Sequence, residues 1–422
     1  MRCACFLVWG ISLTVTFVEG MARDWPAFRG PNGNGRAIDE KPPLEWNREK
    51  NIRWRIAVPG TGNGSPIVVK GRVLLTCAKE NGRRRTLHCF DRTTGRESWK
   101  RTVDVEAIEL THKTNPYGGT TPVSDGTVVV VWHATGGLHC YSLDGEPRWS
   151  RDFGEIRHIW GYGTSPILYR DRVILHSGAS PNIFVAAVRL TDGELIWKTD
   201  EPGGVSNESP GVFTGSWCTP AVMRVAGKDQ IVCGMPTRIV AYDPDDGRVI
   251  WSCAGLSTDR GKVVYTSPLI GDEVVVVLGG YQGPAVAVRA GGSGEVTETH
   301  RLWRVTRRNP QRIGSGVIVG DFIYIANADS GTVQCIDVNT GEERWRERLR
   351  GGAHWASTLL ADGYLFATNQ RGTTHVFRPD PDRLELVATN SLDELINATP
   401  AISDGEWFIR TEKHLYCVSR SK

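Results

Sequence analysis

The sequence predicts an all-β fold, an eight-bladed β-propeller of four-stranded antiparallel blades in which the N-terminal strand completes the last blade and closes the ring. Three observations predict this fold. A Ser/Thr-Pro pair before a short apolar run recurs along the 422 residues. A window with fixed glycine and tryptophan positions follows most of these pairs, and the last repeat lacks a strand that the beginning of the chain can supply. Short strands at regular spacing are typical of closed all-β architectures.

The Ser/Thr-Pro pair marks the start of each repeat, and the mean spacing is about 48 residues. The apolar run after the pair, such as 67–69, predicts the first strand. A tight turn rich in glycine and aspartate follows, for example Asp125-Gly126, and a β-branched run such as 127–131 predicts the second strand. The pairs are Ser65-Pro66, Thr121-Pro122, Ser165-Pro166, Thr219-Pro220, Ser267-Pro268 and Thr399-Pro400, with degenerate copies at Ser315-Gly316 and Ser357-Thr358.

The end of the repeat carries its most specific pattern. Residues 89–99, 187–197, 241–251 and 335–345 share glycine at the seventh place and tryptophan at the eleventh. The glycine supplies the positive φ of a tight turn between the third and fourth strands, and the tryptophan supplies apolar area between blades. The series comprises Trp99, Trp149, Trp197, Trp251, Trp303 and Trp345, with Leu386 at the matching place of the seventh repeat.

The eighth repeat runs from Thr399 to the C-terminus and has no fourth strand of its own. Residues 51–56 alternate apolar and polar side chains, contain Trp54, and end shortly before the first Ser-Pro pair. We therefore expect this N-terminal segment to complete the last sheet, because a ring closed in this way leaves no open end.

These windows resemble the tryptophan-docking motif of the pyrroloquinoline-quinone (PQQ) repeat propellers, and the resemblance covers residues from about 51 to 420. It implies eight blades, with each such tryptophan packed between neighbouring blades. The opening segment 24–35 also resembles the start of many exported bacterial proteins of this kind. The motif specifies the fold more than an activity, because one fold hosts many functions.

The N-terminus predicts export to the periplasm or cell envelope. Residues 1–22 hold one arginine, a short apolar stretch and then small residues, as in a secretory signal peptide. On this interpretation residues 23–50 form an N-terminal extension and residues 51–422 form the propeller. An uncleaved membrane anchor is one alternative, and a cytoplasmic chain that starts at Met21 is another. No other apolar segment is long enough to cross a bilayer, so we expect no transmembrane span in the mature chain.

Composition and motifs exclude several function classes. The net charge is only +3, from 50 basic and 47 acidic residues, which argues against a nucleic-acid partner. After residue 22 there is no C-x-x-C pair and no zinc-ligand spacing. The sequence also lacks the G-x-S-x-G, H-E-x-x-H and P-loop motifs, so no catalytic residue and no metal ligand is assigned.

The cysteines separate into two groups. Four of them fall at one third-strand position where other repeats hold alanine, which predicts small buried side chains rather than disulfides. These are Cys89, Cys140, Cys335 and Cys417. The disulfide state stays open for Cys77, Cys218, Cys233 and Cys253.

The candidate binding site is the end of the channel that carries the inter-blade loops. The insertions 103–119 and 201–217 are expected to stand over this end. Aromatic side chains there can sandwich a planar ligand, while arginine and histidine can bind its carboxylates; the alternative is that these side chains plug the channel mouth. The candidates are Asn63, Tyr117, Trp160, Tyr162, Trp217, Tyr265, Arg312, His354, Trp355 and Asn397.

Two functions fit these observations. The first is a binding or scaffold protein of the cell envelope, similar to the propeller subunit of the outer-membrane protein assembly machinery, which the resemblance implies to have no cofactor. Its partner would be an envelope protein or a small-molecule ligand, and the closed ring would act as a monomer. The second is a PQQ-dependent dehydrogenase that oxidises an alcohol or sugar with PQQ and calcium. The blade motif alone is compatible with both.

Overall fold

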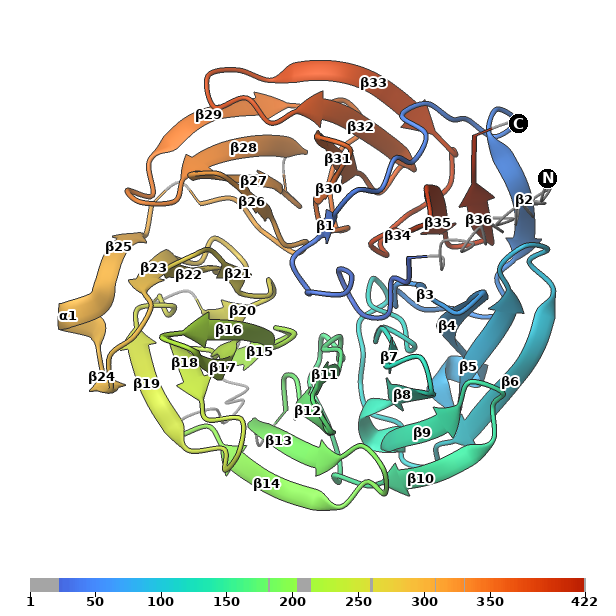
Figure 1. Ribbon diagram of the computed structural model, residues 1–422, viewed down its shortest axis with the longest axis horizontal. Coiled ribbons are helices and arrows are strands. Elements are labelled where there is room, and N and C mark those ends of the chain that lie inside the picture. Colours follow the sequence, from blue (N-terminus) through green and yellow to red (C-terminus); the bar gives the residue numbers. More distant parts are fainter. Residues whose placement is uncertain are drawn as a thin grey trace, which may run out of the picture.

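Eight sheets stand around a central axis, each with four main antiparallel strands (Figure 1). In seven of them the strands run in chain order from the axis outward, and in the eighth the outermost strand comes from the N-terminal part of the chain. The computed structural model describes residues 23–180, 183–202, 214–258, 261–307, 309–329 and 331–420. The eight-bladed propeller predicted from the repeat is confirmed. The predicted signal peptide, residues 1–22, lies outside the described residues.

The first four blades follow the order of the repeats. Blade 1 contains β3 (Ile67–Val69), β4 (Arg72–Lys79), the short 3-10 helix η1 (Glu80–Gly82), β5 (Arg84–Asp91) and β6 (Glu97–Asp104). Blade 2 contains β7 (Val123–Ser124), β8 (Val128–Trp132), η2 (Ala134–Gly136), β9 (Leu138–Ser142) and β10 (Pro147–Arg151). Blade 3 contains β11 (Ile167–Tyr169), β12 (Arg172–His176), β13 (Phe184–Arg189) and β14 (Leu195–Asp200). Blade 4 contains β16 (Ala221–Val225), β17 (Lys228–Gly234), β18 (Arg238–Tyr242) and β19 (Val249–Ala254), with β24 (Gly294–Glu295) added beside β19.

The other four blades complete the ring. Blade 5 contains β21 (Leu269–Ile270), β22 (Val274–Leu278), β23 (Ala285–Arg289), the short helix α1 (Thr297–His300) and β25 (Arg301–Val305). Blade 6 contains β26 (Val317–Val319), β27 (Phe322–Ala326), β28 (Thr332–Asp337) and β29 (Glu343–Arg348). Blade 7 contains β30 (Leu359–Ala361), β31 (Tyr364–Thr368), β32 (Thr373–Arg378) and β33 (Glu385–Ser391), with β1 (Arg36–Ala37) added beside β30. Blade 8 contains β34 (Ala401–Ser403), β35 (Glu406–Arg410), β36 (His414–Val418) and β2 (Ile52–Ala57). A separate parallel pair joins β15 (Thr214–Ser216) to β20 (Lys262–Val264).

The two ends of the propeller sequence share blade 8, as the missing strand predicted. Strand β2 pairs in antiparallel register with β36, so that Trp54 stands opposite Cys417. The order of the sheet is β2-β36-β35-β34, which places the N-terminal strand at its outer edge.

The Ser/Thr-Pro residues explain how the inner strands hold together. The backbone N–H of Ser65 in blade 1 donates to the hydroxyl of Thr121 in blade 2 at 3.0 Å. Across the closing point, the N–H of Thr399 donates to the hydroxyl of Ser65 at 3.0 Å. Equivalent bonds join Thr121 to Ser165, Ser165 to Thr219, Ser267 to Ser315, Ser315 to Ser357 and Ser357 to Thr399. The two degenerate repeats therefore keep the hydroxyl, which accepts a bond, and lose only the proline.

The docking tryptophans bridge consecutive blades. The indole N–H of Trp99 donates to the carbonyl of Leu143 in the next blade at 2.9 Å. The same bond to the next blade is made by Trp54, Trp149, Trp197, Trp303 and Trp345. Trp251 differs: it is fully buried and donates to the Gln230 side chain within its own blade at 2.9 Å. The prediction that each tryptophan packs between blades is thus confirmed for most of the series.

The seventh blade requires a correction. Outer strands contain a β-bulge two residues before the tryptophan, and in β33 the same bulge places Ala388 opposite Val376 and Leu386 opposite Phe377. Ala388, not Leu386, therefore occupies the tryptophan position. The sequence assignment was wrong because the window of this repeat lacks the glycine and tryptophan landmarks that fix the alignment.

Two glycines with nearly equal φ separate backbone strain from packing. Gly247 (φ +74°) lies against the Trp197 ring, whereas an added Cβ at Gly363 (φ +75°) meets nothing within 4 Å. We expect Gly363→Ala to lower the free energy of unfolding by roughly 1–2 kcal/mol, the cost of a left-handed alanine. Gly247→Ala should lower the free energy of unfolding by about 1–3 kcal/mol more than Gly363→Ala does, because the added methyl group displaces the indole of Trp197. Urea unfolding of both variants measures the difference, and equal losses would contradict the packing role.

All cysteines of the described chain are buried free thiols. Cys89 stands opposite Trp99 and Cys140 opposite Trp149, and burial raises the pKa of each thiol to about 12. The prediction of small buried side chains at this position is confirmed. The cysteines whose state was open, Cys77, Cys218, Cys233 and Cys253, are also unpaired.

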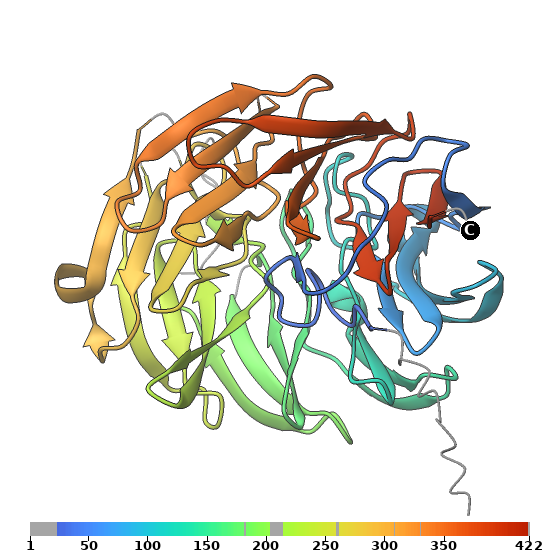
Figure 2. The same ribbon diagram turned by 45° about the horizontal axis from the view of Figure 1, so that its top comes forward.

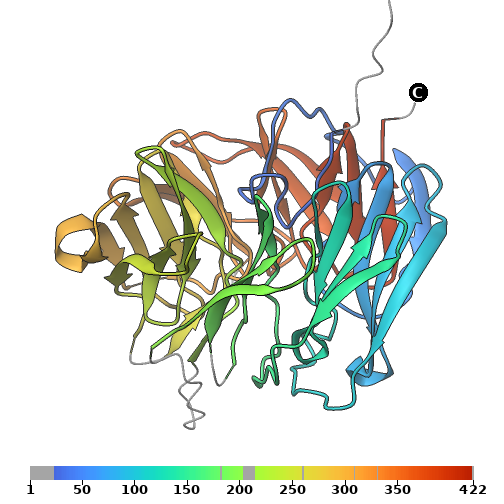
Figure 3. The ribbon, with the colours of Figure 1, turned by 60° about the horizontal axis from the view of Figure 1, so that its bottom comes forward.

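The N-terminal extension lies across one end of the ring (Figures 2 and 3) and passes over its centre in Figure 1. Trp25 exchanges backbone hydrogen bonds of 2.8 and 2.9 Å with Val68 in blade 1. Farther along, β1 pairs in parallel with β30 of blade 7. The extension thus ties together inner strands that are far apart in the sequence.

Arg29 anchors the middle of this extension. Its side chain is only 1% exposed, and its guanidinium donates to the carbonyls of Asn34 and Gly316. Burial lowers the pKa of this arginine to about 9.

Among the described residues, no helix has the length and apolar character needed to cross a membrane.

Candidate functional site

The end of the ring opposite the extension carries the inter-blade loops, and we name it the loop face. A chain of asparagine side chains links three blades there. Asn397 before blade 8 donates to the Asn63 side chain at 3.2 Å, and Asn63 donates to the Thr114 carbonyl at 3.1 Å. Asn115 then donates to the carbonyls of Trp160 and Tyr162 at 2.8 and 3.0 Å. Side-chain amides suit this role because each offers both donors and an acceptor.

An aromatic arc continues from this chain along the loops that precede blades 2 to 5. It consists of His112, His158, Trp160, Trp217 and Tyr265. The Trp217 indole donates to the Gly161 carbonyl at 2.9 Å, and its ring meets Tyr265 edge-on at 5.3 Å. His158 contacts the other side of Trp217 at 4.9 Å, again edge-on. These T-shaped contacts are the preferred geometry of aromatic pairs, so each ring fixes its neighbour.

Burial keeps His158 and Tyr265 neutral at pH 7. It lowers the pKa of His158 to about 4 and raises the pKa of Tyr265 to about 12. Trp160 is 36% exposed. The arc therefore contains two groups that are uncharged at pH 7, His158 and Tyr265, and one partly exposed indole.

Tyr117 and Tyr162 have a different environment from the one predicted. Their rings lie on the buried guanidinium of Arg85, at 5.1 and 5.3 Å from its central carbon. Arg85 also donates to both carboxylate oxygens of Glu109, at 2.8 and 2.6 Å. The Tyr162 hydroxyl accepts the N–H of Gly118 at 3.1 Å. These two tyrosines anchor the insertion that supplies Asn115.

Arg312 and His354 are buried rather than displayed. Arg312 is 1% exposed and donates to the side chains of Asn309 and Gln334 at 3.3 and 3.5 Å. Burial lowers its pKa to about 10. His354 is fully buried, and Trp355 beside it is partly buried. The structure thus brings Asn63, Trp160, Trp217, Tyr265 and Asn397 into one connected rim and places Arg312 and His354 in the interior.

The burial of His354 predicts a pH-dependent stability. Burial lowers the pKa of its imidazole to about 4, so the unfolded chain binds a proton below about pH 6.5 while the folded chain does not. The free energy of unfolding therefore has its full value above about pH 6.5 and falls as the pH drops toward 4. Between pH 7 and pH 5, we expect the free energy of unfolding of His354→Gln to fall by roughly 2 kcal/mol less than that of the wild type. Urea unfolding at both pH values measures this, with the partly exposed His300→Gln as control; equal losses in all three proteins would contradict it.

The described residues of the loop face do not form a carboxylate site for a calcium-bound quinone. Among the described residues, no group of three or more His, Cys, Asp or Glu side chains is arranged to hold a metal ion. The buried carboxylate of Glu109 already binds Arg85 with both oxygens. Calcium takes several oxygen ligands, carboxylate and amide oxygens among them. The amide oxygens of Asn63 and Asn397 on the rim already accept hydrogen bonds, from Asn397 and Gln370 respectively. The predicted insertion 201–217 is described only at 201–202 and 214–217, so its middle lies outside this test.

Sequence reasoning missed Asn115, His112 and His158. Asn115 stands directly before Pro116, a turn signal inside the insertion, and this signal could have identified it. His112 and His158 have no periodic or motif signal, because their partners Trp160 and Trp217 come from neighbouring loops.

Comparison with known proteins gives one family and several similar structures. A family model described as outer membrane protein assembly factor BamB matches residues 83–347 and 330–420. No curated protein sequence matches the chain. The crystal structure of BamB from Moraxella catarrhalis is 12% identical, with a TM-score of 0.59, covering 87% of this chain and 97% of that one.

Two dehydrogenase structures are also similar in fold. Quinohemoprotein alcohol dehydrogenase from Comamonas testosteroni is 12% identical, with a TM-score of 0.68, covering 95% of this chain and 81% of that one. A europium-containing methanol dehydrogenase is 10% identical, with a TM-score of 0.62, covering 93% and 88% respectively. At such identities the likeness shows the fold alone.

Proposed function

The chain belongs to the family described as outer membrane protein assembly factor BamB, and from this premise we propose that it is an exported binding or scaffold protein of the cell envelope, which holds a protein partner on its loop face. The single observation that carries the proposal is the connected rim. Asn397, Asn63 and Asn115 bond across blades, and the aromatic arc extends the rim to Tyr265. A rim fixed before binding loses little entropy when a partner docks.

The chemistry of the rim favours recognition over catalysis. A partly exposed indole beside amide groups is typical of protein-binding surfaces, where tryptophan and tyrosine carry much of the energy. The described rim residues include no carboxylate pair, no nucleophile beside a base and no metal-ligand group. A monomeric propeller with such a surface suits a scaffold role, because all eight blades brace one recognition face.

Site-specific photo-crosslinking in intact cells tests the proposal. A photoreactive residue at position 160 should crosslink to an envelope protein, because the Trp160 ring is accessible on the rim. The same residue at position 98, on the exposed outer strand β6, is the control and should not crosslink to that protein. Crosslinks that are absent at position 160, or equal at both positions, would contradict a loop-face scaffold.

The dehydrogenase alternative makes an opposite prediction. PQQ with Ca²⁺ at a hundredfold excess over Kd would raise the free energy of unfolding by about 2.7 kcal/mol. We expect no thermal shift and no dye-coupled alcohol oxidation, because no group of three or more His, Cys, Asp or Glu side chains among the described residues is arranged to hold a metal ion. A shift together with turnover would replace the scaffold proposal with the enzyme.

A further inference from the structure

The residue before each Ser/Thr-Pro pair has a repeated role from which blade 4 departs. In blades 2, 3 and 5 it is a threonine whose hydroxyl donates to the carbonyl at the end of the second strand. These bonds, of 2.5–2.9 Å, join Thr120 to Trp132, Thr164 to His176 and Thr266 to Leu278. Blade 4 has Cys218 at this place, and Ser216 donates instead to the Gly234 carbonyl at 2.6 Å. The side chain of Cys218 is therefore released from the role that threonine has elsewhere.

The second strand of blade 4 departs from the repeat as well. Cys233 directly follows Val232, which stands opposite Ala241 of β18. The register of the other seven blades places an apolar residue at the position of Cys233; these are Leu75, Val131, Leu175, Val277, Ile325, Ala367 and Ile409. Blade 4 alone thus has cysteine at both places, once for threonine and once for an apolar residue.

The two cysteines lie at the open end of one hairpin and are neighbours in space. The hairpin of β16 and β17 pairs Ala221 with Val232, so Cys218 comes shortly before this pair and Cys233 directly after it. The sulfur of Cys218 accepts the backbone N–H of Gly234 at 3.3 Å, and the thiol of Cys233 is in hydrogen-bonding contact with that of Cys218. Both side chains are fully buried in the same hydrophobic cluster. The structure thus shows the reduced form of an adjacent thiol pair.

We propose that Cys218 and Cys233 form a disulfide when the chain folds in an oxidising compartment, and that this bond fixes the loop that carries Trp217 of the rim. Trp217 directly precedes Cys218, so the bond would fasten this part of the aromatic arc to strand β17. The inference goes beyond the scaffold role and depends on it only for the compartment, because export would bring the chain to an oxidising environment.

The reaction is thiol–disulfide exchange with a disulfide oxidant, such as an exported oxidoreductase or oxidised glutathione. One cysteine thiolate attacks the disulfide of the oxidant and releases its first thiol. The other thiolate attacks the resulting mixed disulfide, which forms the bond between Cys218 and Cys233 and releases the second thiol. The two cysteines lose two protons and two electrons, and the oxidant gains them as its own S–S bond breaks.

Cys253, the third cysteine of blade 4, does not compete for this bond. It stands opposite Ile239 on β18, which in turn stands opposite Gly234 on β17. Two strand spacings amount to about 9–10 Å, whereas bridged cysteines have Cα atoms less than about 7 Å apart. Cys233 can therefore reach Cys218 but not Cys253.

Burial determines when the bond forms and how long it lasts. In the folded chain both thiols are inaccessible, and burial raises the pKa of the Cys233 thiol well above its ordinary value. Exchange needs an accessible thiolate, so the bond forms during folding, once the hairpin brings Cys218 and Cys233 together and before the blade closes over them. The same burial then protects the disulfide from reductants.

The test refolds the purified full chain from its reduced, unfolded state in a glutathione redox buffer. Iodoacetamide then blocks the remaining thiols, and mass spectrometry maps the tryptic peptides. Cys218 lies in the peptide 199–224 and Cys233 in the peptide 229–238, so the disulfide would join two distinct peptides. We expect this linked pair in most molecules, with two fewer blocked cysteines than in a reduced control. Dithiothreitol should reduce the bond at least about tenfold faster in urea than in the folded protein, because burial limits access.

Variants that restore the residue types of the repeat are the controls. Cys218→Thr and Cys233→Val should each abolish the linked peptides and create no other link. Cys140→Ala introduces the residue that blade 3 has at the same third-strand position, Ala187, and should leave the link intact.

Three results would overturn the proposal: both cysteines blocked after refolding, either one linked to a different cysteine, or a stable glutathione adduct in place of the pair. The map of the wild type gives this answer whether or not a variant folds. A link in the refolded chain that is absent from the chain isolated from cells would support the disulfide and contradict export.

Discussion

Trp54→Ala is expected to lower the free energy of unfolding by about 3–5 kcal/mol, the usual cost of removing a large buried aromatic side chain. Trp54 is 9% exposed and sits in the strand that joins the N-terminus to blade 8. Its indole donates to the Arg92 carbonyl at 2.8 Å, and its ring lies 6.0 Å from that of Phe408. Truncation leaves a cavity beside Gly95 and an unpaired carbonyl at the blade 8–blade 1 junction. Guanidinium unfolding measures the loss.

Trp303→Ala is the matched control for this prediction. Trp303 has the same 9% exposure and donates to the Val338 carbonyl at 2.7 Å, but it lies far from the closing point. We expect a similar equilibrium loss from both variants. Hydrogen exchange should differ, because only Trp54→Ala weakens the pairing of β2 with β36 and lets this strand open first. Equal protection of β2 in the two variants would mean that Trp54 has no special part in closure.

The fold was predictable because its signals are local and repeated. The Ser/Thr hydroxyl accepts a bond from the neighbouring blade at seven of the eight junctions of the ring, so the same residue type returns at each repeat. The glycine turn and the tryptophan that packs on it recur for the same reason. Leu386 was misassigned where these landmarks are absent, since a bulge moves the tryptophan position to Ala388.

The site was only partly predictable, because its contacts are made between loops of different blades. Trp217 and Tyr265, both named as candidates from the aromatic residues before the inner strands, lie in contact. Burial could not be read from the same pattern, and Arg312 and His354 lie in the interior. The role of the extension was also hidden: the contact between Arg29 and the Gly316 carbonyl spans 287 positions and has no repeat to reveal it.

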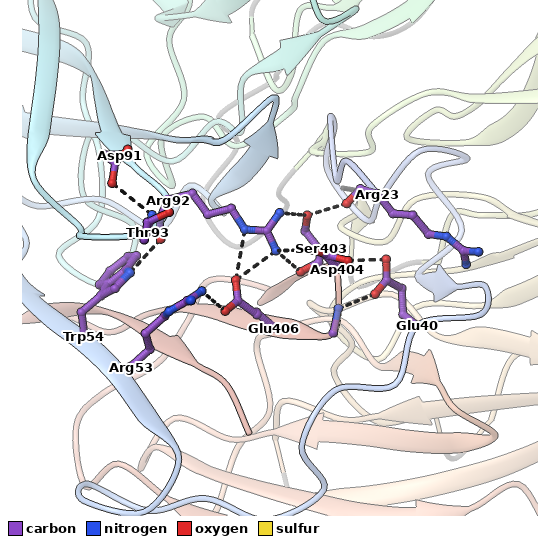
Figure 4. A network of polar contacts seen from close by, with 11 residues as sticks. Arg23, Glu40, Arg53, Trp54, Asp91, Arg92, Thr93, Ser403, Asp404 and Glu406 are labelled. Atoms are coloured by element: carbon purple, nitrogen blue, oxygen red, sulfur yellow. Dashed lines mark hydrogen bonds and ion pairs between the residues drawn. The ribbon is translucent and has the colours of Figure 1, made fainter. Parts of the chain in front are cut away.

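The turn after the third strand of blade 1 makes a second set of contacts with blade 8, where the ring closes (Figure 4). The Arg92 guanidinium donates twice to the Glu406 carboxylate, at 3.0 Å each, and to the hydroxyl and carbonyl of Ser403 at 3.1 and 2.6 Å. Arg53 on β2 binds the other oxygen of Glu406. The extension joins the same cluster, because the Glu40 carboxylate accepts the N–H of Gly405 at 2.6 Å. Four segments from both ends of the chain thus meet around one carboxylate.

Arg92→Ala is expected to cost about 3–5 kcal/mol, because Glu406 is 5% exposed and would keep a buried charge with only the partly exposed Arg53 to balance it. The matched control is Arg72→Ala, which breaks an inter-blade pair with the exposed Asp144 and should cost about 0–1 kcal/mol. Adding Glu406→Gln to Arg92→Ala should recover part of the loss, since the unpaired charge is then gone. Chemical unfolding of the three proteins separates the contributions. A loss from Arg92→Ala no larger than that from Arg72→Ala would show that the closing network is held by backbone pairing alone.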